Sequence, residues 1–206
     1  MGITVSGEGR VAGTPDTLTL TIGISVEREH VSAATDDAAR LASNLVGALE
    51  AEGIEKADIQ TANYSIYPEY DHRDNHRRLI GYRVSNELRV KIRHLDRAGE
   101  IIDRAGSHGG DDVVVQGLSF SLEDNKSLLG AARDAAWHDA RSKAEQLAGL
   151  AGVTLGAPTA ISETFGAPVP IQRHRMQALA ESAAMTPIEA GQLDVSITIQ
   201  VTFGLD

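Results

Sequence analysis

The chain has 206 residues, a formal net charge of −10 and no cysteine. The negative charge disfavours nucleic acid as a partner, because a nucleic-acid-binding surface has to be basic. Without cysteine there is no disulfide, no thiolate metal site and no cysteine nucleophile. No apolar run approaches the roughly 20 residues of a membrane-spanning helix, and no signal-peptide core follows Met1. We therefore expect an exported protein if a leader has been removed, and a cytoplasmic one otherwise.

The first quarter of the chain predicts two strands and a helix. Residues 3–11 and 18–26 alternate apolar with polar or small side chains, as strands with one buried face do. Residues 15–16, Pro-Asp, form a turn signal between them, so an antiparallel hairpin is expected. Apolar residues then recur at helical spacing from the candidate N-cap Ser32 to the stop signal Gly53.

The middle of the chain predicts a second hairpin, a short helix and a further strand. Residues 59–70 and 82–92 read as the two strands of the hairpin, with a polar stretch between them. Asn86 is the one polar residue on the apolar face of the second strand. A short helix over residues 96–107 and a strand over residues 113–122 follow.

The last part of the chain predicts a long helix and two strands. The helix spans residues 125–151 and ends at Gly152, and a strand over residues 153–164 comes next. Residues 165–187 contain three prolines and are predicted to form a long mobile loop. Residues 193–205 alternate without a break, so we expect their apolar face to share one layer with the alanine stripe of the long helix.

These elements predict an α+β fold, an antiparallel sheet of hairpins with the long helices packed on one face. A helix, a glycine stop and a strand occur in the same order around residues 49–54 and 147–153, which leaves two βαβ-like halves open as an arrangement. We expect one domain over residues 1–206, with subdomains 1–94 and 95–206 as the alternative.

One cluster in the hairpin loop has metal-binding residue types. Its members are Asp71, His72, Asp74 and His76. Paired histidines and carboxylates bind zinc and other divalent ions. Three arginines in the same loop oppose a cation, so a solvated turn is favoured and these four residues stay weak candidates. The sequence indicates no catalytic residue and no cofactor site.

Several segments together resemble the SIMPL-domain family, which includes bacterial periplasmic immunogenic proteins and an adaptor of the pelle-like kinase pathway. The segments are VSGEGRVAGTPDTLTLTIGISVE, LEAEGIEKADIQTANYSIYPEY, IGYRVSNELRVKI, ARDAAWHDARSKAEQLAGLAGV and TPIEAGQLDVSITIQVTFGLD. The resemblance covers residues 3–205. It implies an α+β domain without an agreed enzymatic activity, whose members self-associate into ring-like or channel-like oligomers and are mostly exported or lipid-anchored.

The leading hypothesis is a non-enzymatic, self-assembling protein of the cell envelope that acts as a structural or interaction module. The alternatives are an intracellular adaptor that binds another protein, and a metal-dependent hydrolase that uses the region of His72. The candidate contacts between copies are Met176, Leu179 and Met185 in the long loop. The edge of the first strand, which has small residues and few charges, is the other candidate.

Overall fold

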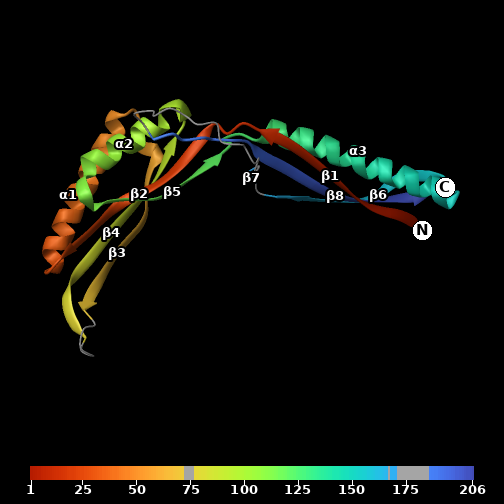
Figure 1. Cartoon of the computed structure of the whole chain (residues 1–206). Helices are drawn as coiled ribbons and strands as arrows, with labels where there is room; N and C mark the ends of the chain where they lie inside the picture. The colour runs from red at the N-terminus through yellow and green to blue at the C-terminus, as the bar shows by residue number, and fades with distance from the viewer. Residues whose placement is uncertain (72–76, 167, 171–185) are drawn as a thin grey trace. The chain divides into compact units, whose positions relative to one another are not determined.

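A computed structural model describes residues 1–71, 77–166, 168–170 and 186–206 (Figure 1). The chain forms two compact units, and neither is one continuous stretch of sequence. Unit 1 takes its described residues from Met1–Pro15, Ser121–Gln177 and Ala190–Asp206, and unit 2 from Asp16–Phe120 and Ala178–Glu189. Most of unit 2 is therefore an insertion in the sequence of unit 1. A single domain over the whole chain stays a prediction.

Unit 1 is a small antiparallel sheet covered by one long helix. Its elements are β1 (Gly2–Gly13), α3 (Lys126–Ala151), β6 (Leu155–Phe165), β7 (Val169–Pro170) and β8 (Leu193–Leu205). The last strand, β8, lies in the middle, with β1 on one side and β6 on the other, and both run antiparallel to it. The short β7 pairs with the first residues of β8. Figure 1 shows α3 running along this sheet.

The core of unit 1 confirms the layer that the alternation of the last strand predicted. The apolar residues of β8 from Leu193 to Phe203 are buried, and four alanines of α3 are buried against them. On β1, Gly7 and Gly9 face the helix so closely that an added Cβ would overlap the backbone carbonyls of Ala136 and Ala132. Small residues on both elements therefore let helix and sheet approach each other closely.

Unit 2 is a second sheet with two helices on one face. Its elements are β2 (Thr17–Arg28), α1 (Val31–Ala51), β3 (Ile59–Asp71), β4 (Arg78–Ile92), α2 (Ala98–Gly109) and β5 (Val113–Ser121), with short 3-10 turns at Lys56–Asp58, Leu95–Arg97 and Gly110–Asp112. The strand order is β3-β4-β2-β5, and β4 runs antiparallel to both β2 and β3. The predicted hairpin of β3 and β4 is confirmed.

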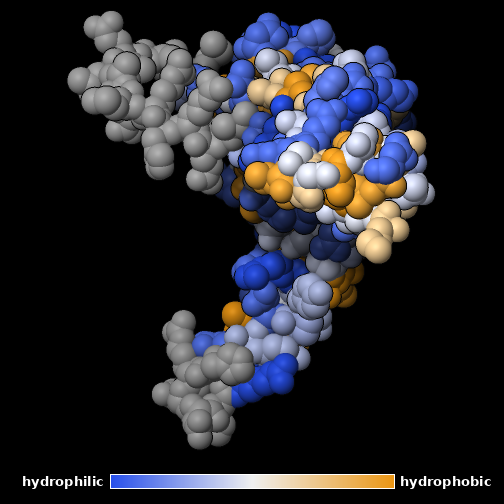
Figure 2. All heavy atoms as spheres, turned by 90° about the vertical axis from the view of Figure 1, so that its right-hand side faces the viewer, coloured by the Kyte–Doolittle hydropathy of each residue, from blue (hydrophilic) through white to orange (hydrophobic). Residues whose placement is uncertain are grey.

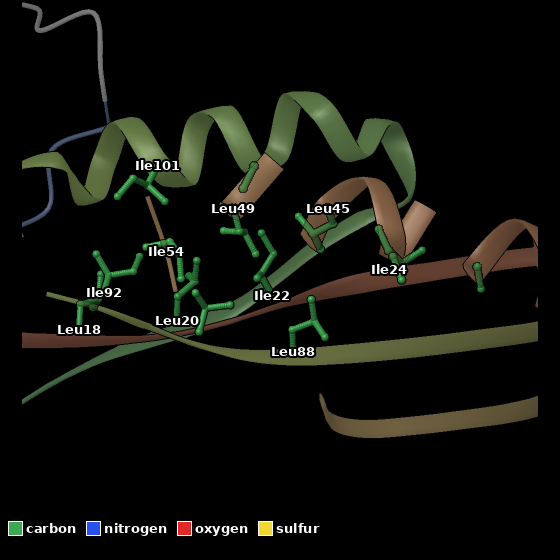
Figure 3. Packing of buried hydrophobic residues seen from close by; sticks show 14 of the residues in the cluster. Leu18, Leu20, Ile22, Ile24, Leu45, Leu49, Ile54, Leu88, Ile92 and Ile101 are labelled. Carbon is green, nitrogen blue, oxygen red and sulfur yellow. The ribbon is translucent and has the colours of Figure 1, made fainter. Parts of the chain in front are cut away.

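Aliphatic side chains from β2, β4, α1 and α2 form the core of unit 2. Figure 3 shows Leu45 and Leu49 of α1 and Ile101 of α2 above the strand residues Ile22 and Leu88. Strand β3 contributes little to this core, because most of its side chains are exposed. The helices therefore cover the middle of the sheet and leave the β3 side open.

The two units share one arrangement of their elements. In unit 2, α1 joins β2 to β3, and β4 lies between these two strands and antiparallel to both. In unit 1, α3 precedes β6, and β8 lies between β1 and β6 and runs antiparallel to both. Strands that are antiparallel to the same neighbour are parallel to each other, so each unit is a βαβ arrangement split by a third strand. The predicted α+β class is confirmed, and both halves are βαβ-like.

Two local predictions are wrong. The first two strands do not form a hairpin, because β1 pairs with β8 and β2 pairs with β4 in a different sheet. The N-cap of α1 is His30 rather than Ser32, and no side chain caps this end of the helix. Both glycine stops are confirmed, since Gly53 and Gly152 have φ values of 87° and 68°, which a residue with a side chain rarely adopts.

Candidate functional site

The predicted metal cluster lies almost entirely outside the described residues. Only Asp71 is described, at the end of β3, where it lies opposite Arg78 of β4. Beside it, the guanidinium carbon of Arg77 is 3.7 Å from the ring centre of Tyr70. In the part of the chain that the structure describes, no three histidine, aspartate or glutamate side chains are grouped to hold a metal ion. His72, Asp74 and His76 therefore stay untested candidates.

The three loop residues predicted to contact another copy also lie outside the described residues: Met176, Leu179 and Met185. The structure instead allows the edges of the two sheets to be compared. An edge strand has unpaired backbone groups on one side, which a strand of another chain can pair with unless they are covered. The edges of unit 1 are β1 and β6, and those of unit 2 are β3 and β5.

The edge at β1 is partly closed by side chains of α3. The backbone N–H of Glu8 donates a hydrogen bond to Oδ2 of Asp139 over 2.8 Å. The ammonium group of Lys143 donates to the carbonyl oxygen of Ser6 over 3.0 Å and to Oδ2 of Asp139 over 2.7 Å. The bond from Lys143 and then the bond from Glu8 hold the pKa of Asp139 below its ordinary value. These backbone groups are therefore occupied, although the sequence indicated an edge with few charges.

The other edge of unit 1 exposes apolar side chains. Ile161 and Phe165 of β6 are 59% and 71% exposed. Their direct neighbours on β8 are Val201 and Ile197, which are buried beneath α3. Directly opposite residues point to the same face of a sheet, so Ile161 and Phe165 continue the hydrophobic layer of the core beyond the helix. Hydrophobic residues reach the surface among hydrophilic ones in the space-filling view (Figure 2).

An ion pair lies between these two apolar residues and joins β6 to the helix. Arg133 of α3 donates to both carboxylate oxygens of Glu163, with Nε to Oε2 at 2.7 Å and Nη2 to Oε1 at 2.8 Å. The guanidinium group holds the pKa of Glu163 below its ordinary value. A bidentate pair fixes orientation, so it holds β6 against α3 while leaving the apolar side chains uncovered.

Sequence reasoning did not single out Ile161 or Phe165, because Ile161 fell within the predicted strand over residues 153–164 and Phe165 at the start of the predicted long loop. One signal was present in the sequence. Pro158 lies within the strand, and proline is confined to edge strands or bulges because it has no N–H to donate. The structure has both features, an edge strand and a shift of register on either side of Pro158.

The edge strand β5 of unit 2 is also apolar and exposed. Val114, Val115 and Leu118 are 42%, 47% and 42% exposed. The strand, VVVQGLSFS, contains no charged residue and no proline. Natural edge strands are usually protected by such residues, so β5 is an edge without that protection, whereas β6 contains both Pro158 and Glu163.

The comparison with protein families matches the model described as SIMPL, protein of unknown function (DUF541), over residues 3–203. The chain belongs to the SIMPL family. The 26 kDa periplasmic immunogenic protein of Brucella melitensis is 32% identical over 212 aligned positions, which cover 98% of this chain and 83% of the relative. The uncharacterized protein YggE of Escherichia coli K12 is 30% identical over 146 positions, which cover 71% of this chain and 58% of YggE.

A third relative, YggE of Edwardsiella ictaluri, is 28% identical over 185 positions, which cover 89% of this chain and 77% of the relative. The family is described as one of unknown function, and among these relatives only the Brucella proteins are named for a compartment, the periplasm. Of the helices in the described residues, none has the length and apolar character to cross a membrane.

Proposed function

We propose that this SIMPL-family chain is a non-enzymatic module of the bacterial cell envelope that works as a homo-oligomer. The observation that carries the proposal is the uncovered apolar edge at β6, where Ile161 and Phe165 extend the core of unit 1 into solvent. A contact there would bury apolar area and pair the free backbone groups of β6 at the same time. The name of the Brucella relatives supports a periplasmic location for this chain as well.

The magnitudes show that two side chains alone do not hold an oligomer together. Fully burying an isoleucine or phenylalanine is worth about 1.5–3 kcal/mol, whereas association costs on the order of 4–15 kcal/mol. A stable contact also buries about 800 Å² on each partner. The β6 edge therefore has to act together with backbone pairing or with a second surface, for which the exposed strand β5 is the candidate.

The test is the mass in solution of the double variant Ile161→Glu, Phe165→Glu, measured by light scattering. We expect it to be smaller than the mass of the unaltered chain, because a charge at an apolar contact opposes burial. The matched control is Leu150→Glu on α3, since Leu150 is 80% exposed and lies outside this edge. An unchanged oligomer in the double variant would contradict the β6 contact, and a loss of mass in the control would make the effect nonspecific.

The alternative is an adaptor that binds a different protein as a monomer. It predicts a monomeric mass for the unaltered chain and a stable complex with its partner. Location separates the two further: after expression from the complete gene, the envelope proposal predicts recovery from the periplasmic fraction, and recovery from the cytoplasm would contradict it.

A further inference from the structure

The loop between β5 and α3 contains an acceptor signal for N-linked glycosylation. Asn125, Lys126 and Ser127 have the pattern Asn-x-Ser with a residue other than proline in the middle. In an exported protein this pattern marks an asparagine that can carry a glycan on the surface. Residues 63–65 of β3, Asn-Tyr-Ser, have the same pattern. The two asparagines differ in their surroundings, and the difference favours Asn125.

The side chain of Asn125 is not used by the helix that it precedes. Asparagine at this N-cap position usually accepts a hydrogen bond from an N–H of the first turn. The carboxamide of Asn125 makes no capping bond to the described groups of α3, and Asp124 takes this role, since its Oδ1 accepts from the N–H of Lys126 over 2.9 Å. Asn125 contributes its backbone carbonyl, which accepts from the N–H of Leu129 over 2.8 Å. Modification of the side chain therefore removes no bond that holds α3.

The segment around Asn125 is accessible to an enzyme. Residues 122–125 belong to neither a strand nor a helix, Asn125 is partly exposed, and Asp124 and Ser127 are exposed. A transferase binds its acceptor outside any helix, so Lys126 and Ser127 have to leave the first turn of α3. This turn opens at little cost, because the first four N–H groups of a helix have no hydrogen-bond partner within it and helix ends fray.

The flanking residues also distinguish Asn125 from Asn63. Two positions before Asn125 is the exposed Glu123, whereas two positions before Asn63 is the neutral Thr61. An acidic residue at that position is part of the acceptor signal in bacteria, where a cationic group of the transferase pairs with it. Asn63 is moreover held in the sheet, because it lies in β3 directly opposite Glu87 of β4. The chain therefore offers one favoured site and one internal control.

We propose that Asn125 is the acceptor of an N-linked glycan, added after export by a transferase that recognises residues 123–127. In the transfer, Nδ2 of Asn125 attacks the anomeric carbon of a glycan carried on a polyisoprenyl pyrophosphate. The N–C bond forms as the C–O bond to the pyrophosphate breaks, the lipid pyrophosphate leaves with the electron pair, and one amide proton passes to a carboxylate of the transferase. This inference rests on the envelope location proposed above, but not on self-association.

The first experiment tests the folded chain as an acceptor. The full chain is incubated with a purified bacterial oligosaccharyltransferase and a lipid-linked oligosaccharide, and the product is analysed by mass spectrometry of the intact chain and of the proteolytic peptide that contains residues 123–127. We expect the mass of the chain to rise by one glycan and fragmentation of the peptide to place that glycan on Asn125. This experiment does not depend on where the chain is located in the cell.

Point variants show which residues the transferase reads. Asn125→Gln is expected to abolish the modification, and Asn63→Gln, the matched control in the other Asn-x-Ser pattern, is expected to leave it unchanged. Ser127→Ala removes the hydroxyl of the signal and is expected to lower the yield at least tenfold, whereas Ser127→Thr keeps it. Glu123→Gln tests the acidic flank and is also expected to lower the yield at least tenfold. Circular dichroism checks that each variant keeps its fold.

The second experiment measures the mass of the chain recovered from the periplasmic fraction of its native bacterium, which should exceed the mass of the polypeptide by one glycan. No transfer by the purified enzyme, transfer to Asn63 in place of Asn125, or an unmodified periplasmic chain would each overturn the proposal. An unmodified periplasmic chain leaves the envelope location standing. Recovery from the cytoplasm would instead contradict that location, and with it the modification in the cell.

Discussion

Replacing Ile197 by aspartate tests the packing of unit 1 most severely. Ile197 is 1% exposed and lies in the middle of β8, between Gly9 of β1 and Phe165 of β6 and beneath α3. Loss of the buried side chain costs about 2–5 kcal/mol. Burial also raises the pKa of a carboxyl group by up to about 3–5 units, and at pH 7 this costs about 4 kcal/mol, because the group becomes protonated once its pKa exceeds the pH. The sum is comparable with the whole stability of a domain, about 5–15 kcal/mol.

The assay uses the one tryptophan of the chain. Trp137 of α3 packs on Phe203 of β8 with ring centres 6.0 Å apart, so its fluorescence reports the unfolding of unit 1. We expect Ile197→Asp to unfold unit 1 at far lower denaturant than the unaltered chain, with a deficit that shrinks at acidic pH as the new carboxyl becomes protonated. Gln200→Asp, on the exposed face of the same strand, is the control and should change stability little. A melting temperature of Ile197→Asp within a degree or two of the unaltered chain would refute the face assignment.

Three further predictions concern other parts of the molecule. Gly9→Ala should cost about 1–3 kcal/mol in chemical unfolding, because α3 has to move away from β1 to admit the methyl group. The double variant His72→Ala, His76→Ala should keep the structure and the native mass unchanged, as measured by circular dichroism and light scattering. Asp103 accepts hydrogen bonds from the hydroxyl and the N–H of Thr186, which hold its pKa below its ordinary value, so the protection factor of the Thr186 amide in hydrogen exchange, corrected for the intrinsic rate, should fall only as the pH falls through that lowered pKa.

Each of these has a clear contrary result. An unaltered stability of Gly9→Ala would mean that helix and strand are farther apart than the structure shows. Tight, stoichiometric zinc that the double histidine variant abolishes would establish a metal site and favour the hydrolase alternative. Because folding lowers the pKa of Asp103, its ionised carboxylate stabilises the folded state when the pH is above the ordinary pKa. This contribution is lost as the pH falls through the lowered pKa. Asp103→Asn should therefore remove the pH dependence at Thr186, and a dependence that persists would point to another group.

The helices and strands could be predicted from the sequence wherever one apolar pattern continued long enough to exclude the other type of element. The apolar alternation continues along β8 for several pairs of residues, and the alanine stripe continues along α3 for several turns. In the structure these two faces pack together. The glycine stops at Gly53 and Gly152 were also predictable, because a positive φ at a helix end needs glycine.

Strand pairing was not predictable in the same way. The short connection between β1 and β2 indicated a hairpin, yet each strand pairs with one from much later in the chain. Local sequence reports the propensity for a strand but not its partner, which depends on which faces can be buried together. The long-range topology therefore appeared only in the structure.

The candidate surfaces were hidden for a related reason. Ile161 falls within a predicted strand and Phe165 at the start of the predicted loop, and only the structure shows that both lie exposed on one edge strand. Asp139 and Lys143 look like ordinary surface charges of a helix, and only the proximity of β1 shows that they occupy its backbone groups. Asn86 was recognisable in sequence as a polar break in an apolar face, whereas the lack of a hydrogen-bond partner for its buried Oδ1 among the described residues was not.

The native mass in solution tests the proposed function most directly. Light scattering on the intact chain across micromolar concentrations should give a multiple of the 21.9 kDa monomer mass, and the multiple should fall when Ile161 and Phe165 are both replaced by glutamate. A mass of 21.9 kDa at every concentration would contradict self-association and leave the protein-binding adaptor as the function to pursue.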